Sequence, residues 1–417
     1  MIGTIHVIGA GIAGLACAVS ATKAGQKVVL YEATKHAGGR CRSFFDTQLG
    51  KTLDNGSHAV LGANPNVFEY LKLLGADNEL VAVEKTGCIP FVDVETGEQW
   101  TLKPDDGLIP KWIFDETRRA PGTRSLDYIR GLRLIVAGGQ QTVSSVIPDV
   151  GTGWDRFWEP LSTAIMNTNA NQASARLLGQ ALWQAIKTWS GGLKSYVPRQ
   201  SLDQTFIAPA LTYLKKSNAA IHFDSPLASI HGDERVTELQ FRANTVSLSP
   251  GDTVVATLPP WSSAIGHLLP NAFDPRPSPI INVHYEIDPN LEYPAMMAVI
   301  GGTAQWAFTR PGLISVTVSA DQDLARLDHL DIAGRLWQDI KTAFALGETP
   351  LPRHRVIVER RATPIQDPTF ASNRPGPQTS MPNLLLAGDW TDTGLPCTLE
   401  SAVKSGFKAA ELARSQA

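Results

Sequence analysis

The feature that most constrains the fold is a glycine pattern near the start of the chain, Gly9-x-Gly11-x-x-Gly14. It follows the apolar run Ile5–Ile8 and opens a segment, residues 12–24, whose apolar side chains recur at helical spacing. Glycines at these positions allow a tight turn, close approach of the backbone to a pyrophosphate, and close packing of a helix on a strand. The N–H groups at a helix N-terminus also favour an anion. We therefore expect a β-α-β unit that binds a dinucleotide.

An acidic residue and a second glycine pair follow the expected second strand, Val28–Tyr31. Glu32 lies about 20 residues after the glycine pattern, where a carboxylate accepts hydrogen bonds from the adenosine ribose hydroxyls. The run Gly38-Gly39-Arg40 suits a second approach to the pyrophosphate, with Arg40 as a charged clamp. Arg42 repeats the charge two residues on, and either faces the same side or forms a surface salt bridge.

With these motifs the chain resembles the superfamily of FAD enzymes that contains the amine oxidases and the carotenoid desaturases. Asp54-Asn55-Gly56-Ser57-His58 is similar to the segment that passes the flavin ring in that superfamily. Ser225-Pro226-Leu227 resembles the segment whose backbone touches adenine, with Leu227 at the contact.

The C-terminal forty residues carry a second part of the resemblance. Leu385-Leu386-Ala387-Gly388-Asp389 resembles a strand ending in the flavoprotein Gly-Asp turn, which implies that Asp389 accepts a hydrogen bond from the ribityl chain. Thr398-Leu399 resembles the start of a helix whose N-terminus points at the flavin pyrimidine oxygen and stabilises negative charge there. The motifs together imply FAD contacts at Gly9, Gly11, Ile12, Ala13, Gly14, Glu32, Ala33, Gly38, Gly39, Arg40, Arg42, Gly56, Ser57, Leu227, Gly388, Asp389, Thr398 and Leu399.

The run Thr393-Gly394-Leu395-Pro396-x-Thr398-x-Glu400 narrows the family. Amine oxidases carry an aromatic residue at the position of Thr398, as half of an amine cage, so Thr398 argues against amine oxidation. Together with Asp54-Asn55-Gly56-x-His58 and Leu61-Gly62-Ala63-x-Pro65-Asn66, the run resembles the hydroxysqualene dehydroxylase family, also called squalene-associated FAD-dependent desaturases. That resemblance implies conversion of hydroxysqualene to squalene, with hydride passing from reduced flavin to the allylic carbon.

Such a reaction needs an acid to protonate the departing hydroxyl, which contributes roughly 10²–10⁴-fold. Asp54 and His58 are the candidates nearest the flavin by motif. Asp54 could instead be a structural carboxylate that bonds backbone or Arg40, and His58 could be a packing residue. No second GxGxxG for NAD(P)H is present, so either transient access of external NAD(P)H or a partner protein is expected to reduce the flavin.

Two other functions share these cofactor motifs. A carotenoid-type, phytoene-like desaturase or isomerase would run hydride transfer in the opposite direction. A non-catalytic, flavin-stabilised isoprenoid carrier would bind lipid without turnover.

A chain of 417 residues suits two domains. We predict an α/β fold, in which a doubly wound Rossmann-like FAD domain holds an inserted α+β substrate domain, as in the glutathione-reductase and amine-oxidase architecture. The FAD domain is expected from residues 1–75, 205–265 and 375–417, and the substrate and membrane-docking domain from 76–204 and 266–374. Expected elements of the insertion are a hairpin of Gly87–Val94 and Gln99–Leu102, strands Ile280–Ile287 and Leu313–Ser319, and helices Arg176–Trp189 and Asp323–Phe344.

Charge and hydropathy restrict the partners. A net charge of −3 gives no general attraction to nucleic acid, and no cysteine or histidine spacing indicates a metal site. No apolar run reaches the roughly 18 residues of a membrane span. We expect a cytoplasmic protein, peripheral to the inner face of the cell membrane, with an isoprenoid lipid as substrate and other squalene-synthesis enzymes as candidate partners.

The segment that fits membrane docking best is Pro110–Phe114 with Arg118 and Arg119. Further along, Arg124, Arg130 and Arg133 are interleaved with apolar residues at 126, 129, 132 and 134. The alternative is a buried helix pair with a solvated basic face. In that case the docking face would lie elsewhere, around Trp183 and Trp189.

Overall fold

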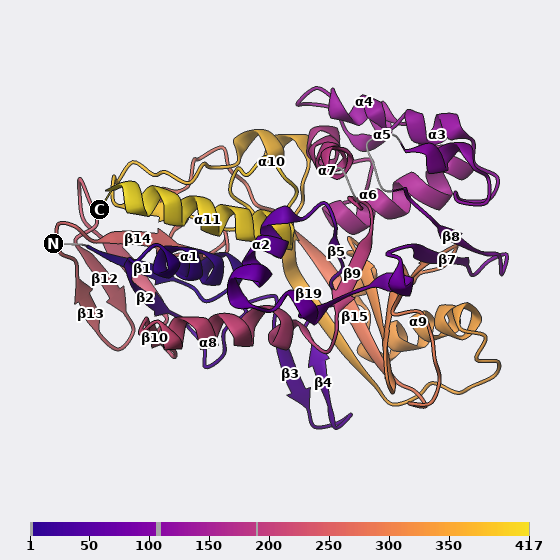
Figure 1. The fold of residues 1–417 in the computed structure, drawn as a ribbon, viewed down its shortest axis with the longest axis horizontal. Helices are drawn as coiled ribbons and strands as arrows, with labels where there is room; N and C mark the ends of the chain where they lie inside the picture. The colour runs from indigo at the N-terminus through magenta and orange to yellow at the C-terminus, as the bar shows by residue number, and fades with distance from the viewer. Residues whose placement is uncertain (1–2, 106–109, 189–190, 417) are drawn as a thin grey trace.

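A computed structural model describes residues 3–105, 110–188 and 191–416 (Figure 1). Its first layer is a five-stranded parallel sheet in the order β10-β2-β1-β14-β20. Ile5 of β1 pairs with Val28 of β2 on one side and with Thr253 of β14 on the other. Strands buried on both faces read as continuous apolar runs, which is the pattern of these segments. The five strands are Thr4–Ile8 (β1), Lys27–Tyr31 (β2), Ala220–His222 (β10), Thr253–Ala256 (β14) and Leu384–Leu386 (β20).

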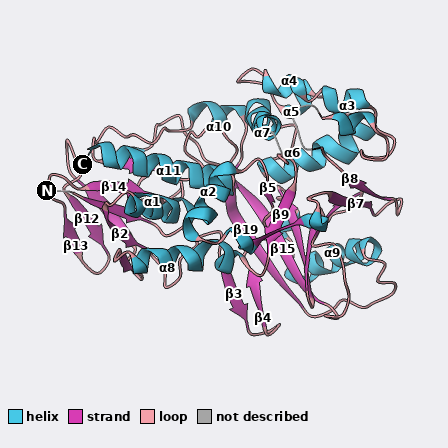
Figure 2. Cartoon of the chain, in the orientation of Figure 1, coloured by secondary structure: helices cyan, strands magenta, loops and turns pink. Residues whose placement is uncertain are grey.

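Four helices pack around this sheet, from both ends and the middle of the chain (Figure 2). The closest contact is between α1 and α11, where a Cβ on Gly406 would stand 2.2 Å from the carbonyl oxygen of Ala13. The core that they share includes Leu15, Val255 and Val403. The helices are Ile12–Lys23 (α1), Pro65–Leu74 (α2), Ala208–Lys216 (α8) and Leu399–Gln416 (α11).

A seven-stranded sheet in the order β19-β15-β18-β17-β16-β7-β8 forms the second layer. One face of this sheet packs against α9, His329–Ala343, through Tyr285 and Trp337. Only β16 and β7 pair in parallel among these strands as described. The strands are Ile89–Asp93 (β7), Gln99–Leu102 (β8), Pro277–Glu286 (β15), Met296–Ile300 (β16), Trp306–Arg310 (β17), Leu313–Ser319 (β18) and His354–Pro364 (β19).

Smaller sheets connect these layers. Strands Leu227–His231 (β11), Glu238–Phe241 (β12) and Thr245–Ser247 (β13) form an antiparallel meander, and Ser43–Asp46 (β3) with Lys51–Asp54 (β4) form a hairpin. The third sheet is β5-β9-β6, from Val60–Leu61, Ser195–Pro198 and Leu80–Ala82.

The expected helix Asp323–Phe344 is interrupted. Leu324–Arg326 forms one 3₁₀ turn, Leu327 is extended, and α9 starts only after Asp328, whose side chain accepts from the N–H of Leu330. An N-cap carboxylate of this kind begins a helix, so it separates the two elements. The hairpin and the two strands of the inserted region were predicted correctly.

The helical region between residues 111 and 187 corrects the expected docking segment. Trp112 is only 4% exposed and packs edge-on against Tyr128; Ile113 and Arg119 are also buried. The prediction that Trp112 meets a membrane is therefore wrong, because its large ring fills a core that the short helices cannot fill alone. The elements here are Lys111–Phe114 (η3), Ser125–Ile129 (α3), Leu132–Ile135 (α4), Val143–Val146 (α5), Glu159–Met166 (α6) and Ala175–Lys187 (α7).

Two further expectations concern membranes. Within the described residues, no helix has both the length and the apolar character to cross a bilayer. Trp183 on α7 is partly exposed, and Trp189 lies outside the described residues.

Candidate cofactor and active site

The glycine turn is built at the carboxyl ends of β1 and β2. Gly9 has a φ of +108°, which L side chains rarely adopt. A Cβ on Gly14 would lie 1.9 Å from the carbonyl oxygen of Gly9, so only glycine lets α1 approach the strand this closely. Ile12 and Ala13, both buried, form the first turn of α1.

Gly11 differs from these two glycines, because no neighbouring protein atom requires a glycine at this position. A Cβ placed there would meet nothing within 4 Å. The open side is flanked by Gly38, whose N–H donates to the carbonyl of Ala10 at 2.8 Å, and by Gly39, where an added Cβ would lie 3.4 Å from the Cα of Gly11. Bare backbone therefore surrounds open space at a helix N-terminus, and the pyrophosphate of a dinucleotide fits that cradle.

Glu32 organises the adjacent ribose position. Its carboxylate accepts from the N–H of Ala10 at 2.9 Å and from the N–H and hydroxyl of Thr34, both at 3.0 Å. The N–H of Ser225 donates to the carbonyl of Glu32, which brings the segment leading to Leu227 beside it. Ala33 is exposed and Leu227 half-buried, so both remain available to an adenosine group.

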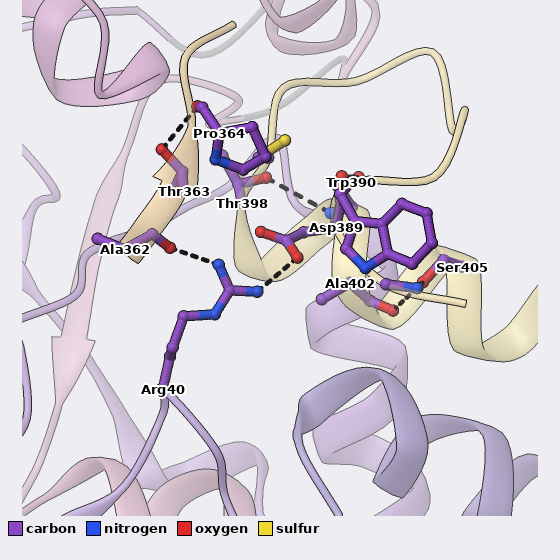
Figure 3. Close-up of polar contacts among 12 residues, drawn as sticks. Arg40, Ala362, Thr363, Pro364, Asp389, Trp390, Thr398, Ala402 and Ser405 are labelled. Atoms are coloured by element: carbon purple, nitrogen blue, oxygen red, sulfur yellow. Dashed lines mark hydrogen bonds and ion pairs between the residues drawn. The ribbon is translucent and has the colours of Figure 1, made fainter. Parts of the chain in front are cut away.

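Arg40 joins the two ends of the chain (Figure 3). Its guanidinium donates to the carboxylate of Asp389 at 2.6 Å and to the carbonyl of Ala362. Desolvation alone would lower the pKa of Arg40, but the Asp389 carboxylate outweighs it and the pKa is raised, so the positive charge is secure. Gly388, just before Asp389, is held by the hydroxyl of Ser405 at 2.9 Å.

The remaining predicted cofactor residues lie around that contact. Thr398 and Leu399 are half-buried at the start of α11, beside the Gly388-Asp389 turn. Arg42 is exposed and forms no ion pair with any residue of the described part of the chain; its carbonyl accepts from Asn55. Gly9, Glu32 and the Gly388-Asp389 turn follow the carboxyl ends of β1, β2 and β20, which lie at one edge of the same parallel sheet.

Asp54 is a fully engaged carboxylate. It accepts from the hydroxyl of Ser43 at 2.6 Å and the N–H of Leu202 at 3.0 Å, and it pairs with Arg310 of β17. An ion-paired carboxylate accepts hydrogen bonds and has no proton to give. This geometry favours the structural alternative for Asp54, although the partner is Arg310 and not Arg40.

His58 lies four residues further on and is half-buried. Its Nδ1 is 3.0 Å from the carbonyl of Gly56, so Nδ1 carries the hydrogen and Nε2 is left free. Burial lowers the pKa of His58, and the Gly56 carbonyl and Asp54 only partly oppose this. His58 is therefore mostly neutral near pH 7, and must take up a proton before it can act as an acid.

Two side chains of β15 that the sequence analysis did not select hold the 54–57 segment in place. Asn282 accepts from the N–H of Ser57 and donates to the carbonyl of Asn55, both at 3.4 Å. His284 donates to the carbonyl of Asp54 at 3.1 Å, and burial lowers its pKa to about 4. A signal existed: an asparagine and a histidine two residues apart share one face of an otherwise apolar strand.

Arg374 is a third residue of the site that the sequence analysis did not select. Its buried guanidinium donates to the backbone carbonyls of Asp389 at 2.7 Å, Leu395 at 2.6 Å, Trp390 at 3.2 Å, and Thr391. It thereby fixes the loop between the Gly-Asp turn and α11. No local pattern around Arg374 indicated this role, because its hydrogen-bond partners are all backbone carbonyls.

Glu400 connects α11 with α2. Its buried carboxylate accepts from the N–H of Asn66 at 3.2 Å, the N–H of Val67 at 3.0 Å and the side-chain amide of Gln184 at 3.1 Å. Burial raises the pKa of Glu400, opposed by these donors. Glu400 therefore caps α2 and fixes the orientation of α11 relative to α2.

Comparison with known proteins agrees with this site. The family model described as flavin-containing amine oxidoreductase matches residues 12–413. A hydroxysqualene dehydroxylase of Zymomonas mobilis is 37% identical, covering 98% of this chain and 99% of its own, and one of Sinorhizobium fredii is 36% identical, covering 99% and 98%. A zeta-carotene desaturase of Synechocystis is more distant, at 22% over 98% of this chain and 96% of its own.

Among solved structures, a putative protoporphyrinogen oxidase from Exiguobacterium superposes with a TM-score of 0.69 at 17% identity, covering all of both chains. At that identity the likeness concerns the fold alone. It confirms the predicted fold class, an α/β protein with a Rossmann-like FAD-binding sheet.

Proposed function

Because the chain belongs to the flavin-containing amine oxidoreductases and, among them, to the hydroxysqualene dehydroxylases, we propose that it converts hydroxysqualene to squalene. The observation that carries this proposal is the full-length similarity to relatives of that name, joined to a cradle that suits FAD. The carotenoid-type desaturase has weaker support, since its relatives are distant. The carrier alternative has no observation in its favour.

The residues that would hold FAD are those of the cradle. Gly11, Gly38 and Gly39 would receive the pyrophosphate, Glu32 the ribose, and Asp389 the ribityl chain. Reduced FAD supplies the hydride that replaces the hydroxyl group. The chain contributes position and charge: Arg40 balances the pyrophosphate, and the N-terminus of α11 provides positive potential beside the flavin.

The departing hydroxyl needs a proton, so that water leaves while hydride enters the allylic carbon. We propose His58 in this role, because its Nδ1 is held by the carbonyl of Gly56, which leaves Nε2 to carry the second proton, and no carboxylate of the described residues hydrogen-bonds the ring. Asp54 then acts by holding the segment in register through Arg310, Ser43 and Leu202.

One anaerobic experiment tests the function. Purified holoenzyme, a nicotinamide or chemical reductant and hydroxysqualene should yield squalene, identified by mass, with one deuterium when the reaction is run in D₂O, because the N5 hydrogen of reduced flavin exchanges with the solvent. Bleaching of the oxidised enzyme by a saturated isoprenoid would support a desaturase instead. Bound isoprenoid with no product and no bleaching would support a carrier.

We propose external NAD(P)H as the source of the electrons that reduce the flavin.

The substrate is proposed to come from a membrane. Keeping a thirty-carbon hydrocarbon in water costs on the order of 20 kcal/mol, at about 0.8 kcal/mol per CH₂, so the substrate should come directly from a bilayer. We therefore propose that the protein works on the inner face of the cell membrane, where other squalene-synthesis enzymes are candidate neighbours.

A further inference from the structure

The exposed apolar side chains of this protein are unevenly distributed. Among the residues that the structure describes, ten large apolar side chains are exposed to solvent, and half of them lie between residues 114 and 136. Isolated exposed apolar residues are normal on a soluble surface, but a cluster indicates contact with another apolar phase. The five clustered residues, called here the outer stripe, are Phe114, Leu126, Ile129, Leu132 and Val136.

Four residues of the outer stripe share one side of a nearly continuous helix. The backbone stays helical from α3 through Arg130 and Gly131 into α4. Leu126, Ile129, Leu132 and Val136 recur every three or four residues along it, and Val136 is 83% exposed. Phe114 lies beside the start of α3, because the hydroxyl of Ser125 donates to the carbonyl of Ile113 at 2.8 Å.

The opposite side of the same helix is anchored in the protein. Tyr128 and Leu134 are buried in two different apolar cores. The indole N–H of Trp158 donates to the carbonyl of Asp127 at 2.8 Å, which fixes α3 from below. The helix that carries the outer stripe is therefore held in place by its opposite side. The stripe can contact another surface without a change in the fold. In Figure 1 α3 and α4 lie on the outer edge of the molecule, far from both termini.

The charge around the outer stripe is positive. Residues 110–136 contain six arginines and lysines against three acidic residues, in a chain whose net charge is −3. Arg124 and Arg133 are exposed, and within the described residues neither forms an ion pair. Basic side chains beside exposed leucine, isoleucine and phenylalanine are the combination that binds an anionic lipid surface.

We propose that the outer stripe is the surface with which this protein docks on an anionic membrane. The apolar side chains enter the acyl boundary, and Arg124 and Arg133 contact the phosphates of the headgroups. This inference rests on the proposed function, because a bilayer-dissolved substrate gives the docking its purpose. It replaces Trp112 with residues on the exposed side of the same region.

Sedimentation with vesicles tests the proposal. FAD-loaded wild-type protein should sediment with phosphatidylglycerol vesicles, less with phosphatidylcholine vesicles, and less at high salt. Leu132→Glu with Val136→Glu should weaken this partitioning at least tenfold, and Arg124→Gln with Arg133→Gln should remove most of its salt dependence. The matched control is Leu330→Glu with Phe45→Glu, two residues that are 61% and 65% exposed outside the stripe and should sediment as wild type.

The readouts separate this proposal from the proposed function. All variants should keep bound flavin, a cooperative melt and normal turnover of hydroxysqualene supplied in detergent. Wild-type sedimentation of the Leu132/Val136 variant would overturn the docking surface. So would a wild type that proves to be a dimer in solution and becomes monomeric on that substitution, because the stripe would then be an interface between two copies. Turnover in detergent without vesicle binding by the wild type would refute docking alone, whereas vesicle binding with no turnover would refute the function alone.

Discussion

Two regions of this molecule, called here the cofactor half and the helical half, constrain their residues in different ways. The cofactor half is the five-stranded parallel sheet with helices α1, α2, α8 and α11, and the helical half is residues 111–187. In the cofactor half, backbone clashes determine residue type: Gly14 has no room for a side chain, and Gly9 has a φ that favours glycine. In the helical half, side chains of one short helix divide between a buried and an exposed side, and both sides are apolar. Local sequence is therefore informative about the first half, and only tertiary packing decides the second.

The largest expected effect separates two glycines of the same motif. Gly14→Val should prevent folding, because its Cβ would overlap the Gly9 carbonyl, whereas Gly11→Val should fold and lose FAD. Circular dichroism melting and the flavin-to-protein absorbance ratio measure both. A Gly11→Val protein with full flavin would show that the open space at Gly11 is not the pyrophosphate site.

The next prediction concerns the ion pair that joins the β3-β4 hairpin to the seven-stranded sheet. Arg310→Met should cost about 3 kcal/mol of unfolding free energy, because it leaves the buried Asp54 carboxylate without its cation. Adding Asp54→Asn should restore part of the loss, measured by urea denaturation of the FAD-loaded protein. If Arg310→Met is neutral, the pair is a surface contact and the segment is held by Asn282 and His284 alone.

Arg40 is expected to affect cofactor affinity more than folding. Arg40→Gln should weaken FAD binding by roughly 10-fold or more, since one charge-assisted contact contributes about 1.5–3 kcal/mol. Titration of apoprotein with FAD, followed by flavin fluorescence, gives the constant. Arg42→Gln is the matched control and should bind FAD as the wild type does. An equal loss of FAD affinity in the two variants would mean that the positive charge attracts FAD without a specific contact.

The smallest predicted change is in turnover. His58→Ala should keep its flavin but slow hydroxysqualene conversion at least tenfold. Because burial lowers the pKa of His58, the acid form is populated only below its ordinary value of 6.5, so the wild-type rate should rise as pH falls through that region. The variant should lose this rise; a pH profile identical to wild type would return His58 to a packing role.

The sequence predicted the parts of the site that depend on neighbours along the chain. The glycine turn, Glu32 and the Gly388-Asp389 turn each sit next to the strand or helix that requires them. Arg310 and Arg374 were not predicted, because they reach the site from a strand and a loop distant in sequence and no spacing marks them. Asn282 and His284 did carry a signal, since they share one face of β15, but that face does not say which segment they contact.

The prediction of which side chains are exposed in the helical half was wrong for a different physical reason. Trp112 and Leu132 both lie in runs that mix apolar and basic residues. The periodicity of such a run predicts an apolar side of the helix, but it does not predict whether that side faces the core or the solvent. The discontinuous domain boundaries stay a prediction, although the parallel sheet does combine strands from β1 to β20.

The contact between Arg40 and Asp389 spans 349 residues. During synthesis the N-terminal glycine turn leaves the ribosome long before its C-terminal partners, and domains with such distant pairings complete their cores late. A chain cut short before Asp389 would lack a parallel strand, a covering helix and one side of the cofactor cradle together. Capture of FAD would then require that the ribosome had already synthesised Asp389 and α11.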